Sequence, residues 1–166
     1  MVNGLANLPQ LVLGPLAGRA DADWYRAPPG KWCAAQIVQH VALSIEYCGR
    51  TFDHRRAHAP MRRRRRTARQ LVSYLAVLRV GWVPGRWRAP VRTTPAEHPS
   101  RGEVTRHFLE GVDRLVGLER DLLPARAADL FVKHPVLGDL TLPEWLRFQD
   151  WHCAHHARQI RARLAG

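Results

Sequence analysis

The chain has 166 residues and a formal net charge of +12, because 26 Lys and Arg residues outnumber 14 Asp and Glu residues. Hydrophobic residues make up 46% of the chain, which is enough for one sizeable core and excludes a disordered, collagen-like or disulfide-miniprotein chain. No apolar run approaches the ~20 residues that a membrane-spanning helix needs. We therefore expect a single domain over residues 1–166 with no membrane partner.

The positive charge is almost entirely arginine, since Lys31 and Lys133 are the only lysines. The codon bias of a GC-rich genome is one explanation, and an anionic partner such as nucleic acid is another. The densest cluster is Arg62–Arg66, and because like charges repel, the sequence predicts a solvated connector there that tolerates replacement. No DNA-reading motif accompanies the run, so nucleic-acid binding is the less favoured interpretation.

The three cysteines are Cys33, Cys48 and Cys153. Their odd number and the lack of a C-x-x-C spacing argue against a disulfide framework and against an all-cysteine zinc site. The first basic residue is Arg19, so the positively charged start of a secretory signal peptide is missing. We therefore expect a cytoplasmic location.

Hydrophobic periodicity predicts four or five helices and no strand. The first helix is weak because Pro9 and Pro15 interrupt it, and the segment 82–99 is rich in Pro and Gly, which predicts an irregular crossing loop. Long helices joined by long loops indicate an all-α four-helix bundle with an extra short helix. The expected helices are Leu5–Arg19, Trp32–Phe52, Thr67–Gly81, Ser100–Leu123 and Thr141–Leu164.

Two histidines, His152 and His156, lie one helical turn apart on the last helix. Trp145, Phe148 and Gln159 share their face, so we expect both imidazoles to point into the bundle. Neutral imidazoles at i and i+4 can bind one divalent ion at ~2.0–2.1 Å. The simpler alternative is a pair of core histidines satisfied by hydrogen bonds, because this spacing is common by chance.

A third ligand has to come from another helix. His40 is the first candidate because it lies on the apolar face of the second helix, and His107 on the third long helix is the second. Three histidines with an open position would indicate a catalytic site, whereas a fourth protein ligand such as Cys33 would indicate a structural one. The remaining histidines fall in predicted loops: His54, His58, His98 and His134.

Segments 32–41, 134–145 and 152–160 resemble the signatures of the DinB/YfiT-like superfamily in order and separation. This resemblance implies an up-up-down-down four-helix bundle whose ligands are His40, His152 and His156. It also implies a divalent ion such as zinc or nickel, and a homodimer, since many members form dimers. Some relatives are transferases or isomerases that use a low-molecular-weight thiol as cosubstrate.

Three further residues are expected to support the ligands. Gln36 and Gln159 are predicted to hydrogen-bond the imidazoles, and His155 is predicted to lie at the rim. The favoured function is a metal-dependent hydrolase or thiol-dependent transferase that acts on a small molecule. The alternative is a basic, nucleic-acid-associated protein whose metal is structural or absent.

Overall fold

The computed structural model describes residues 4–59, 62–82, 89–126 and 129–165. The chain is mostly helical, which confirms the predicted all-α bundle. No helix in the described ranges is long and apolar enough to cross a bilayer. The main elements are α1 (Leu8–Leu13), α2 (Asp21–Tyr25), α3 (Ala34–Arg56), α4 (Ala68–Tyr74), α5 (Arg101–Arg126), β1 (Phe131–His134), β2 (Gly138–Thr141) and α6 (Leu142–Leu164).

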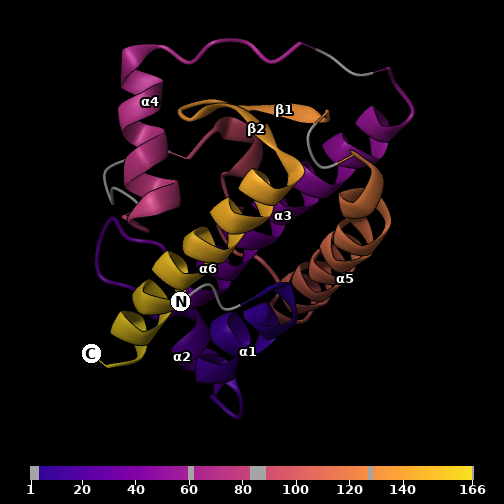
Figure 1. Ribbon diagram of the computed structural model, residues 1–166. Helices are drawn as coiled ribbons and strands as arrows, with labels where there is room; N and C mark the ends of the chain where they lie inside the picture. Colours follow the sequence, from indigo (N-terminus) through magenta and orange to yellow (C-terminus); the bar gives the residue numbers. More distant parts are fainter. Residues whose placement is uncertain (1–3, 60–61, 83–88, 127–128, 166) are drawn as a thin grey trace.

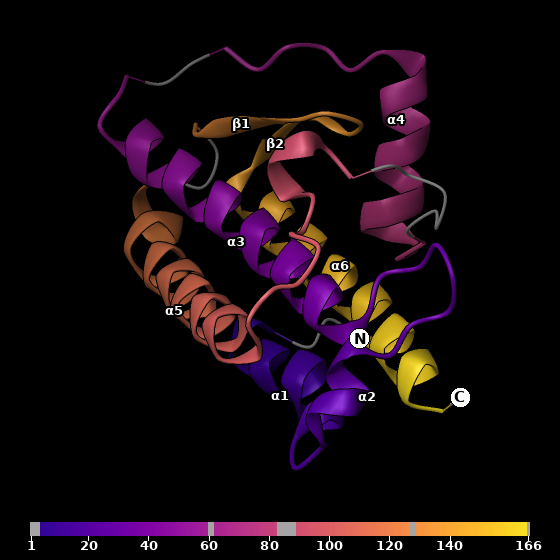
Figure 2. The same ribbon diagram turned by 180° about the vertical axis from the view of Figure 1, so that it is seen from behind.

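Helices α3, α5 and α6 run beside one another and enclose the core, with α1 packed at one end (Figures 1 and 2). The most extensive contact is between α3 and α5. Gly111 makes this close approach possible, because a Cβ atom there would lie 2.8 Å from Cγ2 of Ile45. Phe52, Phe108 and Ile160 are fully buried between the helices. The resulting bundle fixes the distance between the inward faces of α3 and α6.

Several predicted helix ends are corrected. The predicted first helix is interrupted, because Pro9 lies in the first turn of α1 and Pro15 opens a separate 3₁₀ turn, Gly14–Leu16. Helix α5 runs past Pro124 to Arg126 instead of ending at Leu123. Its last turn is held in place because the Arg126 guanidinium binds Asp129 and the carbonyl groups of two residues that end or follow α3, Arg56 and His58.

A small antiparallel hairpin, β1–β2, corrects the expectation of no strand. Val132 and His134 of β1 are buried while Lys133 between them is exposed, which is the alternation typical of a half-buried strand. Strand β2 leads directly into α6, and the indole N–H of Trp145 donates to the carbonyl oxygen of Val132 at 3.0 Å. The hairpin is therefore fastened to the start of α6, above the bundle (Figure 1).

The arginine run is held against this hairpin and the start of α6 by three of its side chains, which corrects the prediction of a solvated connector in part. Arg62, Arg64 and Arg65 are exposed, as that prediction expects. Arg63 donates to the Glu144 carboxylate at 2.6 Å, and Arg64 Nε donates to Oδ2 of Asp139 at 2.9 Å. Arg66 donates to the carbonyl oxygen of Asp139 at 2.9 Å. The partners lie about 75 residues further along the chain, so local sequence could not reveal them.

Part of the predicted crossing loop, residues 83–88, lies outside the described residues. A 3₁₀ turn, Val91–Thr93, follows and contacts α3 (Figure 2). Thr93 is buried there. This contact brings the backbone carbonyl group of Thr93 to the inward face of α3.

Candidate metal centre

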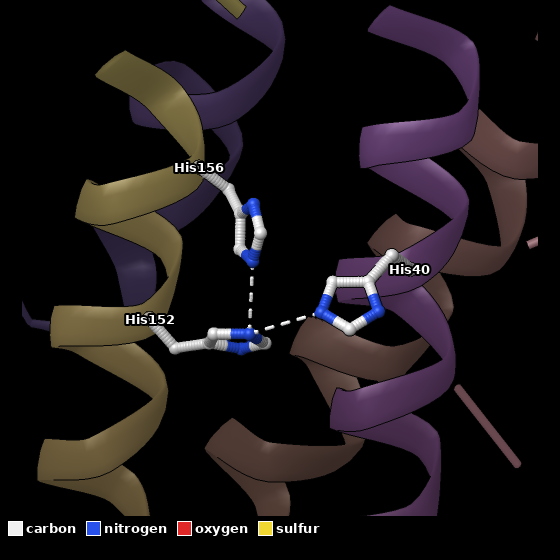
Figure 3. Close-up of side chains that lie close together, drawn as sticks. All are labelled: His40, His152 and His156. Atoms are coloured by element: carbon white, nitrogen blue, oxygen red, sulfur yellow. Dashed lines mark hydrogen bonds between the residues drawn. The ribbon is translucent and has the colours of Figure 1, made fainter. Parts of the chain in front are cut away.

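Helix α6 supplies two of the three predicted ligands. It begins with a capping box, in which Thr141 N–H donates to Glu144 Oε2 at 2.8 Å and Glu144 N–H donates to Thr141 Oγ1 at 3.3 Å. From this fixed start, helical geometry places His152 and His156 one turn apart on the same face. Both imidazoles are buried and point toward α3 (Figure 3).

Helix α3 supplies the third side chain, His40, which is also buried and faces the pair on α6 (Figure 3). The Nε2 atom of His152 lies 3.2 Å from Nε2 of His40 and 3.0 Å from Nε2 of His156. A tetrahedral ion with bonds of ~2.1 Å would hold its nitrogen ligands about 3.4 Å apart. Two of the three separations are close to this value, and the candidate ligand atoms all lie within 4.8 Å of one another, so the cluster could hold one metal ion.

In His40 and His156, the hydrogen bond at Nδ1, the ring nitrogen that faces away from the cluster, decides which nitrogen carries the proton. Nδ1 of His40 is 2.7 Å from the carbonyl oxygen of Thr93, and Nδ1 of His156 is 2.8 Å from Oε1 of Gln159. Both oxygens can only accept, so both rings donate from Nδ1 and keep a lone pair on Nε2. Two lone pairs are thus directed at the same small volume, an arrangement that a cation would stabilise.

Burial lowers the pKa of all three imidazoles, and it brings the pKa of His156 to about 3. For His40 the hydrogen bond with Thr93 opposes this effect without cancelling it. The rings are therefore neutral at pH 7, so no proton competes with a metal for them. Nδ1 of His152 is buried and has no hydrogen-bond partner among the described residues, whereas its Nε2 lies within hydrogen-bond distance of both other Nε2 atoms. Without an ion, the proton of this neutral ring is therefore on Nε2, where the lone pairs of His40 and His156 accept it. A bound ion would take the place of that proton, which would move to Nδ1.

Gln159 and His155 lie beside the cluster as predicted from the sequence. The Gln159 amide accepts from His156 and donates from Nε2 to Nε2 of His155 at 3.1 Å. His155 is half-buried, and its ring centroid is 5.1 Å from that of His156. Gln159 therefore fixes one ligand directly and links it to a fourth imidazole.

Gln36 has a different role, which corrects the prediction that it would hydrogen-bond a ligand imidazole. Its Oε1 accepts the backbone N–H of Cys33 at 3.0 Å, and its Nε2 donates to the carbonyl oxygens of Ala96 and Glu97. Together with Cys33 it forms a capping box at the start of α3. Gln36 therefore supports the helix that carries His40 and directs its hydrogen bonds away from the cluster.

The alternative ligands are not part of the cluster. His107 binds Oε2 of Glu46 at 3.0 Å between α5 and α3, and Cys33 caps α3. The rings of His54 and His58 lie 4.6 Å apart, centroid to centroid, and tilted by 51°, at the exposed C-terminal end of α3. Among the described residues, the group that could hold a metal consists of His40, His152 and His156 alone.

A cleft of about 800 Å³ reaches the cluster, and all three imidazoles line it. His134 also lines it, although the sequence placed that residue in a loop. Its ring lies 4.6 Å from that of Phe148, which in turn stacks on His152 at 5.2 Å. Burial alternates along β1 and turns His134 inward, but the four residues Phe131–His134 show no clear alternation in the sequence that could have identified it.

Comparisons with known proteins agree with this architecture. A sequence model that describes the DinB superfamily matches residues 5–160, a range that contains all three clustered histidines. No curated protein and no solved structure gives a significant match to the chain. Because the family match covers nearly the whole chain, this protein belongs to the DinB superfamily.

Proposed function

We propose that this protein is a metal-dependent enzyme that binds one divalent ion, zinc or nickel, through His40, His152 and His156 and acts on a small molecule. One observation carries the proposal. Hydrogen bonds to Thr93 and Gln159 leave the Nε2 lone pairs of His40 and His156 facing Nε2 of His152, beside a cleft. Such preorganisation is typical of metal sites, in which the second ring nitrogen donates to a protein acceptor.

The donor set supports a catalytic site over a structural one. Structural zinc sites are closed by four protein ligands, whereas three ligands are typical of catalytic sites. When bound, a divalent ion supplies Lewis-acid activation of a small molecule or of its attacking group. A hydrolase and a thiol-dependent transferase both use that chemistry, and they are the two activities that we propose to test.

The residues of the chain itself would bind and orient the substrate. Trp32, Tyr47 and Phe148 give the cleft apolar walls that exclude water. None of the described residues that line the cleft is Asp or Glu, so His155 is the candidate base outside the ligand set. Burial, followed by the nearby Arg158 charge, lowers the pKa of His155, so its ring is neutral at pH 7. To accept a proton at Nε2, the ring would first have to release the hydrogen bond from Gln159.

The nucleic-acid alternative receives less support. Its main basis is the arginine run, and three of those five side chains bind groups of the protein itself: Arg63, Arg64 and Arg66. A residue engaged in this way is less available for phosphate contacts. We therefore favour the small-molecule enzyme.

The proposal is tested by elemental analysis of protein purified without an affinity tag and then supplied with one equivalent of Zn²⁺. We expect one ion per chain in the wild type, and a sharp loss of bound metal in His40→Ala, His152→Ala and His156→Ala. The exposed His54→Ala and His98→Ala variants serve as controls and should keep full occupancy. Circular dichroism checks that each variant is folded. Full occupancy in folded His152→Ala would show that the site is wrongly assigned.

A further inference from the structure

The charged side chains that line the cleft are all positive. Three cationic side chains line it, Lys31, Arg92 and Arg163, while none of its described residues is Asp or Glu. The chain has 14 acidic residues, so their absence from this lining leaves the positive charges there unbalanced. A cleft with one sign of charge and low-dielectric walls focuses the field and attracts ligands of the opposite sign.

All three cations lie close to residues that contact His40. Lys31 precedes Trp32, whose ring centroid is 5.0 Å from that of His40. Arg163 donates from Nε to the carbonyl oxygen of Trp32 at 2.9 Å. Lys31 and Arg163 therefore line the cleft on the side where Trp32 packs against His40.

Arg92 approaches the same region from the 3₁₀ turn before α5. It directly precedes Thr93, whose carbonyl oxygen accepts the hydrogen bond from His40. Its guanidinium carbon lies 6.0 Å from the ring centroid of Tyr47, another residue that lines the cleft. Arg92 and Lys31 are both exposed, so their charges are present where a ligand would enter from solvent.

His134 adds a neutral donor in the wall of the cleft. Its Nδ1 accepts the backbone N–H groups of Val136 at 3.2 Å and Leu137 at 3.1 Å. Since that nitrogen accepts twice, the proton of the neutral ring is on Nε2. The tight turn after β1 thus makes His134 a fixed N–H donor, which suits a ligand with acceptor oxygens.

We propose that the cleft takes a small anionic substrate, whose carboxylate or phosphate group is bound by Lys31, Arg92 and the Nε2–H of His134 while its apolar part lies against the aromatic walls. This inference deepens the proposed function, because it names the substrate class of the same cleft. Its basis is independent of any metal, since the cations and His134 belong to the chain.

The test uses benzoate and its uncharged isostere benzamide as probes, titrated into ¹⁵N-labelled protein at low salt. The backbone and indole signals around Trp32 and Thr93 report binding in the cleft. In metal-free protein we expect benzoate to bind about tenfold more tightly than benzamide, because at least two cations and one donor act on the carboxylate. The preference should weaken as salt is raised.

Matched variants assign the preference to the named side chains. Lys31→Gln and Arg92→Gln should each weaken benzoate binding about two- to fivefold and leave benzamide binding unchanged. Arg120 is also exposed but lies on α5 outside the cleft, so Arg120→Gln should change neither affinity. His134→Asn, whose side-chain oxygen can still accept from the turn, should weaken benzoate binding about tenfold.

Repeating the titrations with zinc-supplied protein separates this inference from the proposed function. Equal affinity of benzoate and benzamide in metal-free protein, no benzoate binding, or a benzoate preference that requires zinc would each overturn the anionic-substrate inference. None of these outcomes affects the metal assignment. Conversely, a benzoate preference in a protein that fails to bind zinc would support the inference and contradict the proposed function.

Discussion

Nδ1 of His156 lies 2.8 Å from Oε1 of Gln159, and this one contact decides which nitrogen of the imidazole carries the proton. With the proton on Nδ1, the lone pair on Nε2 faces His152. Loss of the amide would leave the ring free to adopt the other tautomer. If the cluster binds a metal as proposed, this contact makes Gln159, which is not itself a candidate ligand, a determinant of the metal affinity.

Replacement of Gln159 by Leu should weaken zinc binding about 10–100-fold, because partners of this kind fix the tautomer and the orientation of a ligand imidazole. The affinity is measured by calorimetric titration of zinc in the presence of a competing chelator. Gln159 is partly exposed, so we expect little change in the fold.

Gln36→Leu is the matched control. It removes the capping interaction at the start of α3 and should lower the free energy of unfolding by about 1 kcal/mol. Because Gln36 directs its hydrogen bonds away from the imidazoles, zinc affinity should stay within about twofold of the wild type by the same reasoning. Equal losses of zinc affinity in the two variants would contradict the assignment of Gln159.

Arg66 and Arg65 are neighbours in the arginine run with different surroundings. The Arg66 side chain is largely buried, and its Nε donates to the carbonyl oxygen of Leu137 at 2.9 Å. Its guanidinium carbon lies 3.9 Å from the ring centroid of Tyr74. Arg66→Gln should therefore lower the free energy of unfolding by about 1–3 kcal/mol. Arg65 is exposed, so Arg65→Gln should change it by less than about 0.5 kcal/mol. Urea denaturation measures both, and indistinguishable midpoints would show that the run is a solvated connector after all.

Glu144 should make the free energy of unfolding depend on pH in the acidic range. Burial raises its pKa, but hydrogen bonds from Arg63, the Thr141 backbone and Tyr74 outweigh burial, so the pKa is lower than usual. A carboxyl group whose pKa is lowered by folding stabilises the fold fully above its unfolded pKa of about 4.3. That contribution is lost as the pH falls through the lower folded-state value.

Glu144→Gln should consequently lower the free energy of unfolding by about 1–3 kcal/mol at pH 7. The difference from the wild type should shrink as the pH falls below about 4, where the wild-type carboxyl becomes protonated. Denaturation curves between about pH 3 and pH 7, a range that includes the unfolded pKa of about 4.3, provide the measurement. The exposed Glu110→Gln is the control. A difference that stays constant over this range would rule out a role for the Glu144 charge.

The sequence predicted the long helices and the pair of histidines on α6 because both depend on local periodicity and capping. The Thr141–Glu144 capping box and the i, i+4 spacing of His152 and His156 need no information from the rest of the chain. The apolar face of its helix ranked His40 ahead of His107 as the third candidate ligand, but the residues alone did not exclude His107. That choice depends on how α3, α5 and α6 rotate against each other, and here His107 faces Glu46.

The errors also have physical causes. Gln36 lies one turn before His40, so helical phase favoured a place at the site, but its position three residues after Cys33 makes it a capping residue. The strands of the hairpin have four residues each, too few for a clear alternating pattern, so His134 was assigned to a loop. The partners of the arginine run are distant in sequence, and like charges in a row do not reveal them.

In the proposed site, three imidazoles bind one divalent ion and leave part of its coordination shell open. The most direct measurement is a crystal structure of zinc-supplied protein with anomalous diffraction at the zinc edge. We predict one anomalous peak between the Nε2 atoms of His40, His152 and His156, each at ~2.0–2.1 Å, with the remaining position facing the cleft and filled by no side chain. A peak elsewhere, or a fourth protein ligand that closes the shell, would contradict this account.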